Sequence, residues 1–249
     1  MPAGGGIVAV VGNGKGWFGK FRAAAAELGW ANACLYGVSR ALGCDRAAIG
    51  VHRYYFVAQP VAAGPLLPER RGKGFSVREV EASDPALRAM PLSEDVILYR
   101  RRQGAVCLGL FRDEAMVGCL WLCFGAYEED EVRCRFRPLP ESRAAWDFDV
   151  YLIPEMRSGI AFARLWDGGA AYLRERGIEW SVSRISAFNA MSLRSHGSLG
   201  ARRLGSATFL RIGGWQLMLS GLRPYLHLSL NPAMRPTVAL MTNPRTVER

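Results

Sequence analysis

The sequence contains few histidines and no paired-cysteine motif. The 249-residue chain has three histidines, which are widely separated: His52, His196 and His227. None of the six cysteines forms a C-x-x-C pair, and several fall in apolar stretches, namely Cys107, Cys119 and Cys123. Structural metal sites need clustered cysteine or histidine ligands, so the pattern argues against a metal site. Thiols in apolar stretches predict a cytoplasmic protein whose cysteines are buried and reduced.

The sequence also lacks long apolar runs and the common nucleotide-binding loops. No apolar stretch approaches the roughly 20 residues that a membrane-spanning helix needs, and Gly4–Val11 lacks the basic start and the length of a secretion signal. The glycine-rich segment around Lys15 is not a phosphate-binding P-loop, because no Ser or Thr follows the lysine. Gly14–Gly19 matches G-x-G-x-x-G, but no acidic residue follows at the spacing of a dinucleotide site. We interpret it as a glycine-rich turn.

The charge balance favours anionic partners without choosing among them. The net charge is +10, while 50% of the residues are hydrophobic and 22% are charged, as in a globular protein. Phosphates of a cofactor, acidic lipid, nucleic acid or an acidic substrate would all suit such a chain. We interpret the basic clusters Arg100–Arg102 and Arg202–Arg203 as solvated faces. No recognition-helix or aromatic-strand signature accompanies them, so nucleic-acid binding is not favoured.

The most informative stretch runs from Trp146 to Ala201. Trp146–Ile153 alternates apolar and polar residues, which predicts a strand that ends at Pro154. Apolar residues at helical spacing follow from Ile160, and Gly177 ends that predicted helix. The remainder predicts a second strand over 180–187 and a short helix capped by Asn189 that ends near residue 197.

The turn before the long helix has the features of an anion site. The first turn of a helix presents backbone N–H groups without internal partners, and the helix dipole favours negative charge there. Arg157 and Ser158 lie at this turn, and Gly159 lets a ligand approach the backbone. A diphosphate suits such a site. A plain crossover turn that uses a glycine is the alternative reading of these residues alone.

Two motifs in this stretch resemble those of the GNAT acyltransferase family. The family motif N-x-x-[AS]-x-x-x-[YH]-x-x-x-G-[FA] is met in register at Asn189, Ser192, His196, Gly200 and Ala201. The family's pyrophosphate turn, Q/R-x-x-G-x-G/A, is met at Gly159 and Ala161. There Met156 takes the Q/R position and Arg157 comes one place late. The resemblance covers about residues 73–222.

The resemblance implies a fold class and a division of the chain. It implies an α/β (α+β) domain over 73–222, with a mixed, mostly antiparallel central sheet flanked by helices. Phe75–Val80 resembles its first strand, 105–111 and 116–124 the next hairpin, and 201–212 and 215–220 its last strands. We expect an N-terminal extension over 1–72 that contains a short strand at 6–11, an extra helical segment of two helices and a strand at His52–Gln59. The last strand extends the sheet edge or lines a pocket. Residues 223–249 are expected to be an irregular extension in which 226–230 alone offers a strand.

The resemblance also implies an activity and a set of site residues. The activity is transfer of an acyl group from acetyl-CoA or another acyl-CoA to an amine, in which backbone groups of the splayed fourth strand hold the thioester. The implied coenzyme contacts are Val150, Leu152, Ile153, Arg157, Ser158, Gly159, Ile160, Ala161, Asn189 and Ser192. His196 would donate to the leaving thiolate; alternatively it is a histidine placed to suit a helix C-terminus. Asp147 or Asp149 would be the general base, both on one strand face because they are two residues apart; alternatively that face is simply polar.

Several features leave alternatives open. The run Glu128–Glu131 is interpreted as a solvated loop, or as a group of acids that attracts a substrate amine while Arg133, Arg135 and Arg137 hold an acidic group.

Trp17–Leu28 and Trp30–Leu42 are predicted helices. The first interleaves aromatic and basic residues, as interfacial helices on anionic membranes do, or it packs on the main domain. The chain is therefore interpreted as an acyl-CoA N-acyltransferase with a small-molecule or peptide acceptor. The alternative is a non-catalytic GNAT-fold binding module that contacts a membrane surface or protein partner, and the oligomeric state is left open.

Overall fold

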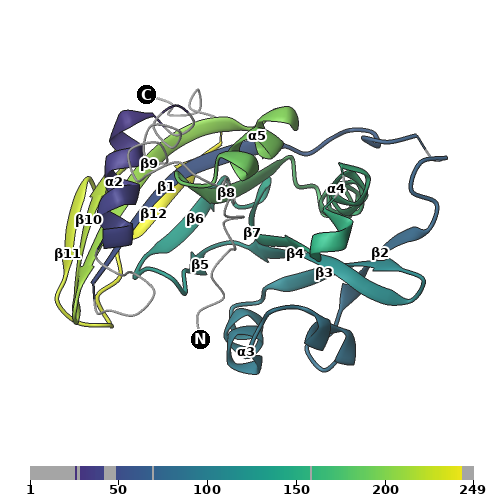
Figure 1. Cartoon of the computed structure of the whole chain (residues 1–249), viewed down its shortest axis with the longest axis horizontal. Helices are drawn as coiled ribbons and strands as arrows, with labels where there is room; N and C mark the ends of the chain where they lie inside the picture. The colour runs from purple at the N-terminus through teal and green to yellow at the C-terminus, as the bar shows by residue number, and fades with distance from the viewer. Residues whose placement is uncertain (1–25, 27–28, 42–48, 69, 158, 243–249) are drawn as a thin grey trace, which may run out of the picture.

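A computed structural model describes residues 26, 29–41, 49–68, 70–157 and 159–242 (Figure 1). Within these ranges the chain forms a nine-stranded sheet and a three-stranded sheet. The predicted strand at 6–11, the glycine motif at 14–19 and the predicted helix at 17–28 lie outside the described residues, apart from residue 26. The second predicted helix is present as α2 (Trp30–Ala41).

The nine-stranded sheet is mostly antiparallel, as expected. Each pair of neighbouring strands is antiparallel except β7 and β8. Within the described residues the predicted strands all form, to within a few residues of the expected ends. In spatial order they are β11 (Leu226–Ser229), β10 (Trp215–Ser220), β9 (Arg202–Ile212), β1 (Ile49–Pro60), β8 (Trp180–Ser186), β7 (Ala144–Leu152), β4 (Ala115–Phe124), β3 (Val106–Arg112) and β2 (Phe75–Val80).

The first described strand, β1, lies inside the sheet between β8 and β9. Its pairing with both neighbours runs along most of its length, and Phe56 and Ala58 are fully buried. The expectation that this strand extends the sheet edge is therefore wrong. The alternation of apolar residues in the sequence identified a strand, but it carried no information about which strands would pair with it. The division of the chain after residue 72 stays a prediction, although β1 shares its sheet with the rest of the fold.

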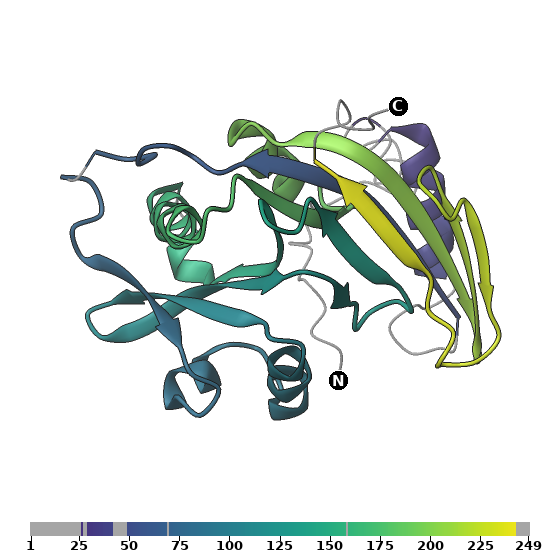
Figure 2. The same ribbon diagram turned by 180° about the vertical axis from the view of Figure 1, so that it is seen from behind.

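The two faces of the large sheet are covered by different elements (Figures 1 and 2). Helices α2, α4 (Gly159–Arg174) and α5 (Ala190–Ser198) cover one face. The other face carries α3 (Glu94–Arg102), the 3₁₀ turn η1 (Pro85–Ala89) and the three-stranded sheet. That sheet is ordered β12 (Thr237–Met241), β6 (Arg135–Leu139) and β5 (Tyr127–Glu128). Each face needs such a layer because its apolar side chains must be buried.

Alternation along β7 divides the core into two parts. Trp146 and Phe148 belong to the cluster beneath the small sheet, where Trp146 stacks on Phe136 at 5.0 Å between ring centroids. Ala145 and Leu152 belong to the second cluster, beneath α4. Successive side chains of a strand point to opposite faces. The strand that carries the candidate site is therefore anchored from both sides.

Helix α4 packs unusually close to the sheet at a pair of glycines. A methyl group at Gly168 would collide with the side chain of Val77 on β2, and one at Gly169 would lie 2.8 Å from Leu120 on β4. The helix ends before Gly177, which has a φ of 71° and so adopts the left-handed conformation that ends many helices. The start of α4 is thereby held against the end of β7.

The segment between β1 and β2 is fastened along α4. The backbone N–H of Leu66 donates to Asp167 Oδ1 at 2.6 Å, and Arg164 Nη2 donates to the Pro68 carbonyl at 3.1 Å. Arg174 donates to the Ala62 carbonyl. The connection between β1 and β2 therefore forms one flank of the α4 face.

Three further features differ from or extend the expectations. The C-terminal part is not wholly irregular, because β12 pairs in parallel with β6 in addition to the expected β11. Helix α3 was not expected from the sequence.

Cys107, Cys119, Cys123 and Cys134 are buried free thiols, as predicted, and Cys34 is exposed. Among the described residues, no helix combines the length and the apolar character that crossing a membrane requires.

Candidate functional site

The two parallel strands β7 and β8 separate partway along their length. They pair only at Ala144–Trp180, Ala145–Ser181 and Trp146–Val182, whereas β7 continues to Leu152 and β8 to Ser186. The splay implied by the family resemblance is therefore confirmed. Beyond Trp146 the two strands leave a split in the sheet, and the candidate residues lie around it on both faces.

A bulge in β7 reverses the side on which one candidate residue lies. The register between β4 and β7 shifts between Cys119 and Trp121, and Asp149 has a φ of 51°. A bulge places successive residues on one face. Asp149 consequently pairs with Arg100, whose guanidinium lies over the Phe148 ring, while Val150 packs in the cluster beneath α4.

The expectation that Asp147 and Asp149 share a face is therefore wrong. Asp147 lies beneath the α4–α5 layer, where the Ser181 hydroxyl donates to its Oδ2 at 2.5 Å. Asp149 lies on the opposite face. The two-residue spacing predicts a common face only for a regular strand, and an inserted residue breaks that rule.

On the α4 face, the structure brings Asp147 and His196 together in a buried polar group. His196 is only 4% exposed and its ring meets Trp166 of α4 edge-on at 5.6 Å. Its Nδ1 lies 3.1 Å from Gln59 Oε1 at the end of β1. Gln59, Trp166 and Ser181 also line a narrow pocket beside this group, together with Pro60, Val61 and Leu199. The inserted strand β1 thus contributes a residue to the candidate site.

Burial governs the protonation of both groups. It raises the pKa of Asp147, against the opposing effects of His196 and of the hydrogen bond from Ser181. It lowers the pKa of His196, although the charge of Asp147 opposes that shift. In the tautomer that carries its proton on Nδ1, His196 donates to the Gln59 oxygen and Nε2 is an acceptor. Both shifts follow because a low-dielectric site disfavours the charged form of each group.

The start of α4 leaves room for a ligand beside its backbone. No atom lies within 4 Å of where a Gly159 side chain would begin, so the backbone there is open to a ligand. Ile160 is exposed, but Ala161 is fully buried in the core, so only its backbone could reach a ligand. Arg157 Nε donates to the Leu152 carbonyl at 3.1 Å. Ser158 lies outside the described residues.

The backbone at the end of β7 corrects one expected contact. The Ile153 N–H donates to the Val117 carbonyl at 3.0 Å, so it is not free for a thioester. In an antiparallel pair, backbone groups point alternately to the partner strand and away from it. Leu152 is therefore the residue whose backbone faces the split, consistent with its carbonyl accepting from Arg157.

Asn189 caps helix α5, as its place in the sequence predicts. Its side-chain oxygen accepts a hydrogen bond from the Ser192 backbone N–H at 3.0 Å. The cap satisfies one of the helix's free N–H groups. The coenzyme contacts expected for Asn189 and Ser192 stay predictions.

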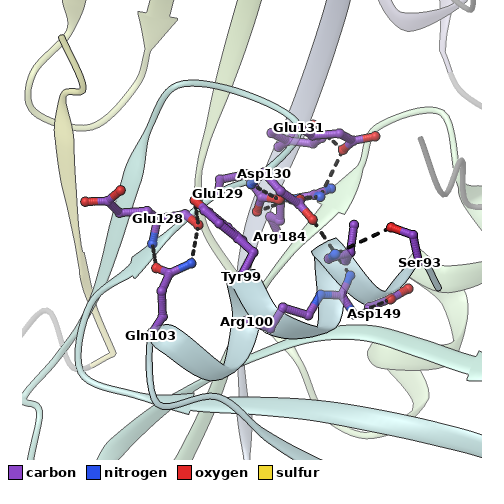
Figure 3. A network of polar contacts seen from close by, with 12 residues as sticks. Ser93, Tyr99, Arg100, Gln103, Glu128, Glu129, Asp130, Glu131, Asp149 and Arg184 are labelled. Atoms are coloured by element: carbon purple, nitrogen blue, oxygen red, sulfur yellow. Dashed lines mark hydrogen bonds and ion pairs between the residues drawn. The ribbon is translucent and has the colours of Figure 1, made fainter. Parts of the chain in front are cut away.

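The opposite face of the split carries a cluster of charged residues that the sequence reading undervalued (Figure 3). Arg100 of α3, expected on a solvated face, is 4% exposed and pairs through Nη1 with Asp149 at 2.7 Å and through Nη2 with Asp130 at 3.8 Å. Its guanidinium lies 5.0 Å from the Trp121 ring centroid. The run of arginines at 100–102 in the sequence does not indicate that Arg100 is the one whose side chain is buried.

The acidic segment Glu128–Glu131 is not a solvated loop. Arg184 of β8 forms a bidentate pair with Glu129, at 2.7 and 2.9 Å, and contacts Glu131 at 2.9 Å. Tyr54 donates to Glu131 at 2.6 Å. Burial alone would raise the pKa of Glu129, but the Arg184 charge and hydrogen bonds lower it to about 2. The interpretation as a solvated loop is therefore wrong.

Hydrogen bonds also fasten this segment to α3. The Tyr99 hydroxyl and Gln103 Nε2 both donate to the Glu128 carbonyl, at 3.0 and 3.1 Å. The Glu128 N–H donates back to Gln103 Oε1 at 2.7 Å. The segment is thus held between α3 and β8, across the split from β7. The signal that could have found it is the acidic run itself, placed next to an apolar hairpin.

The described residues contain no group of His, Cys, Asp or Glu side chains arranged to hold a metal ion. No family model matches the chain, and no curated protein matches it.

Solved structures similar to the chain include acetyltransferases of the GNAT family. One, from Novosphingobium aromaticivorans, is 21% identical over 64% of this chain and 62% of its own, with a TM-score of 0.44. A tandem GNAT protein from the clavulanic acid biosynthesis pathway is 14% identical over 61% of this chain and 50% of its own, with a TM-score of 0.41. A Trypanosoma brucei acetyltransferase is 21% identical over 51% of this chain and 92% of its own, with a TM-score of 0.35. The matched part of this chain thus spans less than two thirds of the first two structures.

Proposed function

We propose that the protein transfers an acyl group from an acyl-CoA, acetyl-CoA in the simplest case, to an amine. The observation that carries the proposal is the split between β7 and β8, with an open helix start at its edge and a buried acid–imidazole pair beneath α4 and α5. The motif at Asn189–Ala201 supports the same function through the family resemblance.

The residues present fit the coenzyme. The first turn of α4 offers backbone N–H groups and positive potential to a diphosphate, and the space beside Gly159 is open. Arg157 adds positive charge at the same turn. The backbone of Leu152 would hold the thioester end in the split. The coenzyme would supply an acyl group on a thioester, a good leaving group for transfer to nitrogen.

Asp147 and His196 would serve the leaving side of the reaction. Burial keeps the Asp147 carboxyl protonated to a higher pH than usual, so the pair holds a proton that it can give to a departing thiolate. The pair is then one proton short and regains it from solvent. Asp149 is held by Arg100, so we assign it a positioning role in place of the general-base role expected from the sequence.

An acceptor would approach from the other face. The coenzyme site lies at the start of α4, so the α4 face of the split is the donor side. The charged cluster on the α3 face is then the surface that meets the acceptor, which we expect to be a small molecule or the exposed end of a peptide.

The test is release of free thiol from acetyl-CoA that depends on an added amine. We expect wild-type protein to turn over, and Asp147→Asn to lower kcat about 10²-fold, as loss of one acid–base group does, with little change in acetyl-CoA affinity. Asp113→Asn, an exposed turn residue on the β3–β4 hairpin, is the control. Thiol release that is independent of any amine, or unaffected by Asp147→Asn, would contradict the proposed chemistry.

A second candidate is a binding module that does not turn over acyl-CoA. It is favoured by Arg157, which donates to the Leu152 carbonyl and so engages the part of β7 that a thioester would need. Tight acetyl-CoA binding without thiol release would support this candidate.

A further inference from the structure

The acidic segment Glu128–Glu131, which lies over the split, is partly buried and has more carboxylates than guanidinium groups that form ion pairs with it. Five carboxylates gather there: Glu128, Glu129, Asp130, Glu131 and Asp149. Among the described residues, three guanidinium groups form ion pairs with them, those of Arg100, Arg184 and Arg235. A fourth, that of Arg211, donates to the Glu131 backbone carbonyl at 3.2 Å. The whole chain carries a net charge of +10, so a local excess of carboxylates is unusual for this molecule. A cationic ligand would balance it.

The members of the cluster differ in how firmly each is held. Glu129 is nearly fully buried in its bidentate pair with Arg184, and Asp149 lies 2.7 Å from Arg100. Asp130 is hydrogen-bonded to Glu129, its contact with Arg100 is 3.8 Å long, and its side chain is 32% exposed. Asp130 is therefore an accessible carboxylate, and its contact with a guanidinium group is the longest in the cluster.

A second observation points to a ligand at the same place. The Tyr127 hydroxyl is fully buried and has no hydrogen-bond partner among the residues that the structure describes. The Tyr127 ring stacks on Phe148 at 4.4 Å between ring centroids, and the Arg100 guanidinium lies over the same Phe148 ring at 5.1 Å, so Tyr127 lies beside the cluster. A buried hydroxyl without a partner is costly, and a bound ligand would satisfy it.

The position of the cluster suits attack on a thioester in the split. Asp149 belongs to β7 and Arg184 to β8, each just beyond the last residue pair that joins the two strands. The segment 128–131 links them across the gap on the α3 face (Figure 3). A group bound at Asp130 would therefore meet the split from the side opposite α4.

The protonation of Asp130 matches the demands of a base at neutral pH. Partial burial, together with the hydrogen bond and the charge of Glu129, raises the pKa of Asp130 to about 7, while Arg100 and Arg184 oppose the shift. Burial, together with the charge of Asp130, raises the pKa of both Tyr99 and Tyr127. A base is most effective when its pKa lies near the working pH.

We propose that Tyr127, Asp130 and the neighbouring carboxylates form the acceptor site, that it prefers an amine with a second positive charge, and that Asp130 receives the proton of the reacting amine. The proposal rests on the proposed acyl transfer. The amine nitrogen forms a bond to the acyl carbon, the carbon–sulfur bond breaks, and the nitrogen's proton passes to the Asp130 carboxylate and then to solvent. Asp149 and Arg100 position Asp130.

The charge preference is tested with three amines of equal length. Free-thiol release from acetyl-CoA is measured with 1,4-diaminobutane, 1-aminobutane and 4-aminobutanoate, using the full chain. We expect kcat/KM to be at least tenfold higher for the diamine than for 1-aminobutane, and lowest for the carboxylate. Equal values, or a preference for 4-aminobutanoate, would overturn the site.

The role of Asp130 is tested through the pH profile. For the wild type, kcat/KM should rise through an inflection near pH 7 as Asp130 loses its proton. Asp130→Asn should lower kcat by about 10²-fold and remove the inflection, whereas Asp130→Glu should retain it. Asp113→Asn should match the wild type. A wild-type profile in Asp130→Asn would overturn the assignment, and thermal melts of each variant establish that it is folded.

Ligand-observed NMR with 1,4-diaminobutane alone separates this inference from the proposed function. Binding that is lost in Asp130→Asn, but without acetyl transfer, would support the cation site and contradict acyl transfer. Acetyl-CoA binding without diamine binding would overturn the cation site and leave the coenzyme site standing.

Discussion

Two buried carboxyl groups on the candidate site have opposite pKa shifts, and their surroundings explain why. Glu129 faces the guanidinium of Arg184, which lowers its pKa to about 2 in spite of burial. Asp147 has hydroxyl partners but no fixed cation, so burial raises its pKa. The first group stabilises the fold as a carboxylate. The second destabilises it in that form, which is a common property of groups that take part in proton transfer.

The Glu129–Arg184 ion pair should make the free energy of unfolding depend on pH in the acidic range. The folded-state pKa of Glu129 is about 2 and lies below the ordinary glutamate value of 4.5, so the stabilisation is present above pH 4.5 and is lost as the pH falls toward 2. We expect Glu129→Gln to lower the free energy of unfolding at pH 7 by about 3 kcal/mol, because it leaves Arg184 without its main partner. Denaturant titrations at pH 7 and pH 3 check this, and an equal loss at both would contradict it.

Asp147→Asn should behave in the opposite way. The folded-state pKa of Asp147 is raised, so the wild type loses stability as the pH rises above the pKa of the unfolded carboxyl. An uncharged amide removes that loss. We therefore expect the variant to be at least as stable as the wild type at pH 7, while kcat falls. A large drop in its thermal midpoint would show that the carboxylate is structural.

At the scale of elements, the α4 helix is placed by its glycine pair. Gly168→Ala introduces a methyl group that collides with Val77, and overpacking of this kind costs about 1–3 kcal/mol. Gly197→Ala on α5, where nothing lies within 4 Å, is the matched control and should be neutral or slightly stabilising. Urea unfolding of both variants gives the comparison. Equal stability would mean that α4 can move away from β2 without penalty.

Asn189 is expected both to cap helix α5 and to contact the coenzyme, and a charged substitution can distinguish the two roles. Asn189→Ala should cost about 1 kcal/mol of stability through loss of the cap on Ser192. Asn189→Asp keeps a capping oxygen and adds a negative charge. If Asn189 also contacts the coenzyme, the Asp variant should be stable yet bind acetyl-CoA at least tenfold more weakly. Unchanged affinity in calorimetry would leave Asn189 as a cap alone.

The sequence predicted elements well and contacts between distant elements poorly. Alternation and terminating residues located β7, β8, α4 and α5, because strand and helix periodicities are local properties. Three features depended on contacts that local patterns do not encode. They are the insertion of β1 between β8 and β9, the bulge at Asp149 and the burial of Arg100.

The same limit applies to the candidate site. The donor side was predicted from a motif, whereas the acidic segment was read as solvent-exposed. Its burial depends on Arg184 and Arg100, which come from 53 or more and 28 or more residues away in the chain. A charge run is solvated unless such partners meet it, and the partners become visible only in three dimensions.

At the scale of the whole molecule, the sheet is continuous across the predicted boundary at residue 72. Strand β1 separates β8 from β9 and pairs with both. A fragment of residues 73–222 would lack this strand and expose two long unpaired edges. We expect it to show no cooperative unfolding transition, whereas the full chain does. A cooperative melt of the fragment would mean that β8 and β9 can pair directly.

The most direct test of the account is a calorimetric titration of acetyl-CoA into wild-type protein and two variants at the start of α4. Gly159→Asp and Gly159→Asn add side chains of the same size into open space, and only the first adds negative charge. The account predicts binding by the wild type, retained affinity in Gly159→Asn, and at least tenfold weaker binding in Gly159→Asp, because a carboxylate there repels the diphosphate. Equal affinities for the two variants, or no binding by the wild type, would contradict the claim that this turn and the split hold an acyl-CoA.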